Sequence, residues 1–213
     1  MIDLALLYEL RLRTPRLELR LGSRDELVAL AHVAEDGIHP REEMPFGAAW
    51  SDSIGEPGFV DGFVAFHVGQ LAAWAPVDWH LNLLVWANGR LVGTQSVGAE
   101  RFAETKTVVT GSWLGTRFQR RGYGTEMRAA VLELAFRGLG AVAAESGWLE
   151  GNSASRRVSE KLRYREVRVG EVAPRGVPVR HHDVRLERDA WVCPVPVEIT
   201  ALGPCLTLFE VPS

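Results

Sequence analysis

The sequence predicts an α+β fold in one mixed domain, and three observations lead to that prediction. The 213 residues are 46% hydrophobic and 24% charged, with a net charge of -3, which is typical of a folded chain with a sizeable core. Alternating apolar and charged residues predict strands, whereas apolar residues spaced three and four apart predict helices. Both patterns run along the chain without an internal repeat, so strands and helices are expected to share one core.

The N-terminal part is expected to contribute one strand and two helices. Residues 17–21 alternate apolar and charged side chains, as a half-buried strand does. Ser23 is a predicted N-cap, and Glu26 three residues later completes a capping box. Residues 38–58 are rich in Pro, Gly and aromatics and are interpreted as an ordered loop. Helical spacing of apolar residues returns over residues 59–74.

The middle of the chain predicts a hairpin and a third strand. Strand-like runs at residues 81–86 and 91–97 flank Asn88-Gly89, which is the strongest short hairpin signal. Another β-rich run covers residues 107–114. The three runs therefore predict three strands, of which the first two form a hairpin.

The C-terminal part alternates helices and strands. The apolar spacing predicts a helix over residues 125–137, followed by a short strand at 141–144. Asn152 or Ser153 is expected to cap a last helix, which ends near residue 162. The remaining expected strands are 166–172 and 179–187. One domain is therefore expected over residues 1–190, with residues 191–213 as a C-terminal extension packed on the same domain or on a dimer partner.

Composition also narrows the class of partner and the compartment. The slightly acidic net charge argues against a nucleic-acid partner. No run approaches the ~18 apolar residues that a membrane span requires. Asp3 and Glu9 interrupt the N-terminal apolar run, so a signal peptide is not expected, and two cysteines make no secreted disulfide framework. A cytoplasmic protein is expected.

A turn rich in glycine and arginine carries the main functional signal. It follows the strand-like run at 107–114 and precedes a helix, whose N-terminal N–H groups and partial positive charge attract a phosphate. Gly122 and Gly124 lack Cβ atoms and let backbone amides approach a pyrophosphate, while Arg120 and Arg121 add positive charge. On these residues alone, a plain strand–helix turn with solvated arginines stays an open alternative.

Other functional motifs are excluded. Met127 occupies the place of the third glycine of a dinucleotide-binding fingerprint, and no lysine follows a glycine as a P-loop requires. No Gly-x-Ser-x-Gly elbow is present. The six histidines follow no zinc-ligand spacing, and no metal is expected.

Gln119-x-x-Gly122-x-Gly124 resembles the cofactor motif of the GNAT superfamily of N-acetyltransferases. The segments that resemble its RimJ/RimL-type branch, which acetylates protein N-termini, are 14–17, 111–114, 122–126 and 152–158. Met44-Pro45-Phe46 and residues 122–131 are also similar to an actinobacterial GNAT protein reported to use succinyl-CoA. The resemblance extends over residues 14–188.

The resemblance implies a GNAT fold, in which a mixed, mostly antiparallel sheet is splayed at the cofactor cleft and flanked by helices. The splayed strands would be residues 107–114 and 141–146, with pantetheine in the gap. The implied cofactor-binding residues are Trp113, Leu114, Gln119, Arg120, Arg121, Gly122, Tyr123, Gly124, Thr125 and Asn152. A homo-oligomer is also expected.

The family's reaction is direct attack of an amine on a thioester, so the resemblance implies an acid and a base. The tyrosine that many members use as the acid is replaced here by Ser159, and Ser155 is the expected acid by analogy with the RimL-type branch. Glu171 is the expected base, with Glu145 and Glu126 as competing carboxylates. Helix capping by Ser155 and ordinary solvation of the carboxylates stay open as alternatives.

The loop with Met44, Phe46 and Trp50 is expected to roof the acceptor site, and Trp113 to lie on its floor, although core packing would explain the same aromatics. The leading hypothesis is an N-acyltransferase that uses acetyl-CoA, or succinyl-CoA, and a protein N-terminus, a lysine or a small amine. An acyl-CoA-binding regulatory protein without turnover is the alternative. A phosphate-sensing interaction protein is a third.

Overall fold

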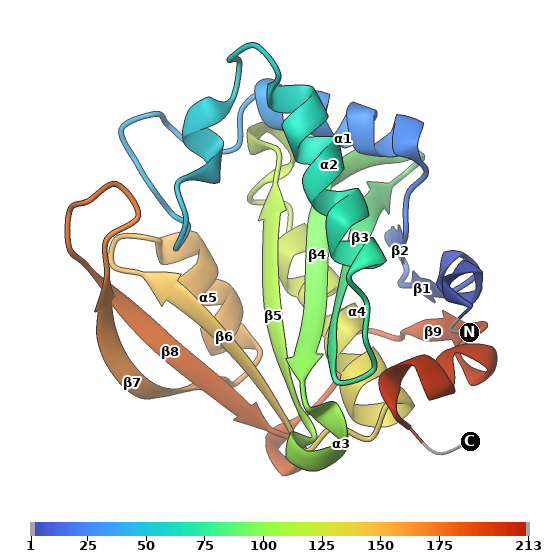
Figure 1. Ribbon diagram of the computed structural model, residues 1–213. Coiled ribbons are helices and arrows are strands. Elements are labelled where there is room, and N and C mark those ends of the chain that lie inside the picture. The colour runs from blue at the N-terminus through green and yellow to red at the C-terminus, as the bar shows by residue number, and fades with distance from the viewer. Residues whose placement is uncertain (1–2, 212–213) are drawn as a thin grey trace.

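A computed structural model describes residues 3–211 as one nine-stranded sheet with helices on both faces (Figure 1). The strand order is β7-β8-β6-β5-β4-β3-β2-β1-β9, and only β5 and β6 pair in parallel. Helices α1 and α2 contact β4 and β3, whereas α4 and α5 contact β4, β5 and β6. The predicted α+β class and the splayed, mostly antiparallel sheet are confirmed.

The bounds of the elements follow the sequence patterns closely. The helices are α1 (Arg24–Glu35), α2 (Phe59–Ala72), α3 (Phe102–Thr105), α4 (Tyr123–Glu133) and α5 (Ser153–Lys161). The strands are β1 (Arg11–Arg13), β2 (Leu17–Arg20), β3 (Asp78–Ala87), β4 (Arg90–Glu100), β5 (Thr107–Leu114), β6 (Ala143–Leu149), β7 (Arg165–Val172), β8 (Val179–Glu187) and β9 (Glu198–Thr200).

The predicted helix cap at Ser23 and the predicted hairpin turn at Asn88-Gly89 are confirmed. Ser23 caps α1 in a full capping box with Glu26. Asn88 and Gly89 both have positive φ between β3 and β4, as the favoured two-residue hairpin turn requires. Local side-chain chemistry fixes both features, and this is why the sequence alone reveals them.

Three elements differ from the sequence prediction. Strand β6 begins at Ala143 and continues to Leu149, later than the predicted strand at residues 141–144. The helix before it ends in a π-helical turn over Leu134–Gly138, and residues 141 and 142 connect that turn to the strand. The short strands β1 and β9 were not predicted. Strand β9 pairs with β1, and Ile199 lies opposite Leu12.

The C-terminal residues join the same core. Phe209 packs edge-on against Trp74 and Trp79, with ring centroids 5.3 and 4.8 Å apart. The Trp74 indole N–H donates to the main-chain oxygen of Leu208 at 3.1 Å. Residues 191–211 therefore contact the domain itself. The last two residues of the predicted extension, 212 and 213, and residues 1 and 2 lie outside the described residues.

Candidate functional site

The central feature is a gap where two neighbouring strands part. Strands β5 and β6 pair only from Thr107–Ala143 to Val109–Glu145. Two residues further along, Gly111 and Gly147 occupy equivalent positions across the gap, and no ladder joins them. Side chains alternate between the two faces of a strand, so both glycines face the side of α1 and α2. An extended ligand could pair with the free strand edges there.

The glycine turn lies at the end of β5 that opens into this gap. Gly122 has φ +83° and precedes the first residue of α4, and Arg120 has φ +59°. Arg16 crosses from the N-terminal segment, donates to the main-chain oxygen of Arg121 at 2.9 Å and covers the ring of Tyr123. The turn therefore presents the start of a helix and several exposed guanidinium groups, as predicted for a pyrophosphate site.

Gln119 and Asn152 connect this turn to the loop over residues 38–58. The Gln119 side-chain amide donates to the main-chain oxygens of Ile38 and Leu114, at 2.8 and 3.0 Å. Asn152 accepts from the main-chain N–H of Ser155 at 3.0 Å and donates to the main-chain oxygen of Pro45 at 3.2 Å. Asn152 thus acts as the helix cap and also holds the loop.

Ser155 and Ser159 lie on α5, behind the gap. Ser155 is half-buried, and the structure assigns its hydroxyl no hydrogen-bond partner among residues 3–211. Ser159 is 2% exposed, and its hydroxyl is also without a partner in that part of the chain. Of the two, Ser155 is the more accessible hydroxyl.

The three carboxylates considered as bases have different surroundings. Glu126 is 4% exposed and is bound by Arg16 and Thr14, so it has a structural role. Glu145 is paired with Arg185 at 2.7 Å. Glu171 is exposed on the edge strand β7, where it lies opposite Arg180.

Sheet alternation puts Glu171 on the α5 side of the sheet. Residues opposite each other in an antiparallel ladder share a face, and the residue after Gly170 must point to the other face. Gly170 lies opposite His181, whose ring lies over Gly147 on the face of the gap. Glu171 is therefore on the reverse of that face, and its role as a base stays a prediction.

The predicted roof is assembled from aromatic side chains. Trp50 lies 5.2 Å from Phe46 and 6.0 Å from both Phe63 of α2 and Trp113 of β5, between ring centroids. Met44 is half-buried in the same loop, with its sulfur 4.0 Å from the Ser51 hydroxyl. The aromatic groups therefore form one cluster beside the gap.

An ion pair ties this roof to the hairpin between β7 and β8. Arg175 donates from Nε to Asp52 at 2.9 Å and from Nη2 to the main-chain oxygen of Arg41 at 2.9 Å. In Figure 1 the loop and the hairpin approach each other over the splayed strands. The roof is thus held by residues more than a hundred positions apart.

Arg128 is a site residue that the sequence reasoning missed. It is 3% exposed on α4 and bonds Ser146 of β6 at 2.8 Å and Ser112 of β5 at 3.2 Å, so it bridges the strands just past their separation. Its third partner is the neutral Gln95 at 3.5 Å. No ion pair joins it to a carboxylate among residues 3–211, and every residue of α4 from Glu126 to Glu133 is buried, so the helix pattern alone does not single Arg128 out.

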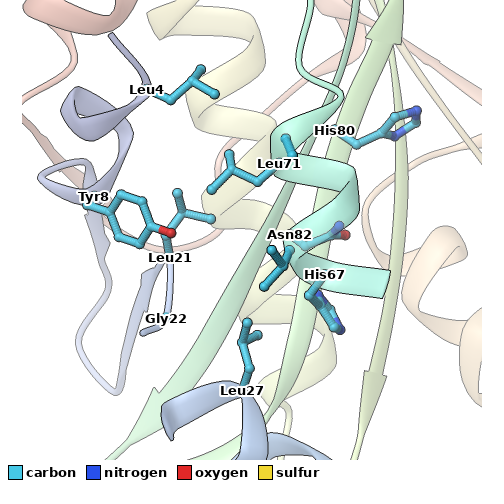
Figure 2. Close-up of a pocket in the computed structure, with 11 residues that line it drawn as sticks. Leu4, Tyr8, Leu21, Gly22, Leu27, His67, Leu71, His80 and Asn82 are labelled. Carbon is cyan, nitrogen blue, oxygen red and sulfur yellow. The ribbon is translucent and has the colours of Figure 1, made fainter. Parts of the chain in front are cut away.

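A separate cavity of about 250 Å³ lies between α2, β3 and the N-terminal segment, away from the gap (Figure 2). Tyr8 and Leu21 line one side of it, and His67 and Leu71 of α2 line the other. The His67 ring also packs against Phe63 in a tilted arrangement, with centroids 4.7 Å apart. Burial lowers the pKa of His67 to about 4, and its Nδ1 has no partner in the described chain.

Within residues 3–211, no three His, Cys, Asp or Glu side chains gather closely enough to hold a metal ion. In the same range, no helix has both the length and the apolar character that crossing a bilayer requires.

Comparison with known proteins agrees with this geometry. The model of the Acetyltransferase (GNAT) domain family matches residues 16–165, well over half of the chain. Mycobacterium smegmatis RimJ in complex with CoA-disulfide superposes with a TM-score of 0.69 at 17% identity, covering 95% of both chains. A putative ribosomal-protein-serine acetyltransferase from Vibrio cholerae gives 0.65 at 19% identity, over 83% of this chain and 97% of that one. RimL, a ribosomal L7/L12 alpha-N-protein acetyltransferase in complex with coenzyme A, gives 0.65 at 15% identity, over the same shares.

Proposed function

Because this chain belongs to the GNAT acetyltransferase family, we propose that it transfers an acetyl group from acetyl-CoA to an amine. The observation that carries the proposal is the parting of β5 and β6 beyond Val109 and Glu145, next to a positive-φ glycine turn that begins α4. One feature offers free strand edges to an amide-containing arm, and the other offers helix N–H groups to a pyrophosphate.

The proposed cofactor path runs along β5. The pantetheine arm would lie beside Trp113 and Leu114, and the main-chain amides from Gln119 to Thr125 would hold the pyrophosphate. Arg120 and Arg121 are exposed and add charge. Among these residues Gln119 instead supports the turn, because its side-chain amide donates to Ile38 and Leu114 and its main-chain N–H donates to the main-chain oxygen of Thr116 at 3.2 Å.

The proposed reaction joins the amine nitrogen to the thioester carbonyl carbon while the carbon–sulfur bond breaks. Ser155 would donate a hydrogen bond to the departing thiolate, and Glu171 is the base that the resemblance suggests. The cluster of Met44, Phe46 and Trp50 would exclude water from the acceptor side, which strengthens polar interactions there.

The acceptor is proposed as a protein N-terminus, with lysine and small amines as alternatives. Support comes from RimJ and RimL, which share the fold, and from the exposed edge strand β7 beside the roof. A cytoplasmic homo-oligomer is part of the same proposal.

Arg128 favours a second donor, succinyl-CoA. A buried guanidinium normally has an anionic partner, and here its partners are neutral. The carboxylate of a succinyl group would supply the missing charge at the parting of the strands. If so, Arg128→Met lowers kcat/KM for succinyl-CoA roughly tenfold more than for acetyl-CoA. Equal losses with both donors would reject the succinyl assignment and leave acetyl transfer in place.

The test of the main proposal combines calorimetry with coenzyme A and a thiol-release assay with peptides and small amines. Binding with turnover supports the transferase. Binding without turnover across the amine panel would favour the regulatory alternative, and absence of coenzyme A binding would reject both.

A further inference from the structure

Two adjacent histidines on β8 have opposite surroundings. His182 is buried and stacked on Trp148 at 3.7 Å, and both ring nitrogens are engaged, by Glu166 at 2.6 Å and Glu150 at 3.0 Å. His181 is on the other face of the sheet. Its Nδ1 lies 2.9 Å from Asp183, and its side chain is 28% exposed. His182 is a structural residue, whereas His181 keeps one nitrogen, Nε2, without a protein partner in the described chain.

The free nitrogen of His181 lies at the mouth of the gap. A Cβ built on Gly147 would stand 2.5 Å from His181 Nε2, so the imidazole occupies the space that a side chain at 147 would take. Gly147 is the second residue of β6 beyond its last pairing with β5. The Asp183 carboxylate lies 2.9 Å from Nδ1, and a ring protonated on Nδ1 presents the Nε2 lone pair to this opening.

We propose that His181 is the proton acceptor of the acyl transfer and that Asp183 is its positioning residue. The inference rests on the proposed function. As the amine nitrogen bonds to the carbonyl carbon, its proton moves to His181 Nε2, and the electron pair of the broken carbon–sulfur bond leaves with the thiolate. The proton then passes from the half-exposed imidazole to solvent.

The charged side chains around His181 are each engaged in an ion pair. Asp183 uses one oxygen for His181 and the other for Arg168 of β7, at 2.6 Å. On β6 and further along β8, Glu145 and Arg185 form their own pair. Gly170 of β7 lies directly opposite His181 and brings no charge. Asp183 is therefore the charged group in direct contact with the ring.

The chain contains a matched control on β3. His80 lies over Gly98 of β4, where an added Cβ would meet its Nδ1 at 2.4 Å, and Asp78 stands two residues away with an oxygen 3.6 Å from Nε2. The residue types and the spacing are the same as in the His181–Asp183 pair. His80 is two strands from β5 on the side away from the gap. A histidine over a glycine is thus a packing arrangement in itself, and only its place at the gap distinguishes His181.

The experiment measures kcat/KM against pH with acetyl-CoA for the whole protein and for His181→Gln, Asp183→Asn, His80→Gln and Glu171→Gln. Two acceptor amines with different pKa values are compared. A fall in kcat/KM at low pH that comes from protonation of the amine shifts with the pKa of the acceptor, whereas a fall that comes from an enzyme group stays at the same pH. Calorimetry with coenzyme A and thermal melts accompany each variant.

We expect His181→Gln to lower kcat/KM about a hundredfold, within the range for a general base. The variant should also lose the fall in kcat/KM at low pH that does not depend on the acceptor, with coenzyme A affinity unchanged. Asp183→Asn lowers kcat/KM about tenfold, and His80→Gln behaves as wild type. If His181→Gln does not fold, the pH profile of Asp183→Asn tests the proposal in its place. A wild-type profile in His181→Gln, or loss of that fall at low pH in Glu171→Gln instead, overturns the proposal. Absence of turnover in the unmodified protein would reject the transferase function itself, which is a distinct result.

Discussion

The proposed cofactor side and the proposed acceptor side of the gap are built in different ways. The turn at Arg120, Gly122 and Tyr123 is contiguous in sequence, and one strand–turn–helix unit fixes its geometry. The acceptor side combines the loop before α2, Phe63 of α2, Trp113 of β5 and the β7–β8 hairpin. A backbone site for a ligand can therefore be formed by one contiguous segment, whereas the wall expected to select the acceptor depends on segments brought together by the whole fold.

The largest expected effect concerns α2, which carries part of the acceptor wall. The folded-state pKa of His67 is lowered by burial to about 4, below the ordinary value of about 6.5. The unfolded chain therefore binds a proton that the folded chain refuses, and stability is lost as pH falls from about 6.5 towards 4. At pH 4.5 the loss is about 2.5 kcal/mol, or a melting temperature lower by roughly 5–10 °C.

Thermal melts at pH 7 and 4.5 measure this effect, with His67→Phe as the comparison. The variant keeps an aromatic ring against Phe63 and should lose the histidine's share of the acid sensitivity. The same acid shift in both proteins would show that folding does not lower the pKa of His67.

The next effect tests the cofactor side. Gly122→Asp adds a negative charge where a pyrophosphate is expected, and coenzyme A affinity should fall at least ~30-fold, about 2 kcal/mol. Gly140→Asp is the control, because Gly140 also has positive φ but lies beyond the end of α4. An added Cβ meets nothing at Gly140, and at Gly122 it meets only the end of the Arg16 side chain, at 3.2 Å. Calorimetry on both folded variants separates backbone strain from the loss of a phosphate contact. Equal affinities in the two variants would remove the pyrophosphate assignment.

A comparable effect is expected for Ser155, the half-buried hydroxyl near the start of α5. Ser155→Ala should lower kcat roughly tenfold to a hundredfold with coenzyme A affinity nearly unchanged, because a thiolate is already a good leaving group and needs only a hydrogen bond. Asn152 caps α5 through the Ser155 N–H, which the variant keeps, so the melting temperature should change little. Wild-type turnover with an earlier melt would make Ser155 structural.

The sequence predicts the features that contiguous residues fix, and it does not predict those formed by segments far apart in the chain. Ser23 and Asn88-Gly89 carry their structure in their own chemistry, and the glycine turn does too. The contacts of Arg128 depend on where α4 crosses the parted strands, and the position of His181 depends on Gly147 in another strand. Nothing in the spacing along the chain reports such pairings.

The smallest expected effect sharpens the acceptor side alone. Arg175 is tied to Asp52 and to the main chain of residues 41 and 42, so it holds the roof from outside the aromatic cluster. Exposed ion pairs contribute little stability by themselves, but this one restricts a loop. Arg175→Ala should therefore raise the acceptor KM about threefold to fivefold and leave coenzyme A affinity unchanged.

The control for Arg175→Ala is Arg101→Ala, since Arg101 forms an exposed ion pair with Glu104 far from the loop. Steady-state kinetics with the acceptor varied at saturating acetyl-CoA gives the KM, and calorimetry gives the coenzyme A affinity. A rise in KM limited to Arg175→Ala means that the roof takes part in acceptor binding. Equal behaviour of the two variants would mean that the loop keeps its place through Phe46 and Trp50 alone, because their packing against Trp113 already fixes it.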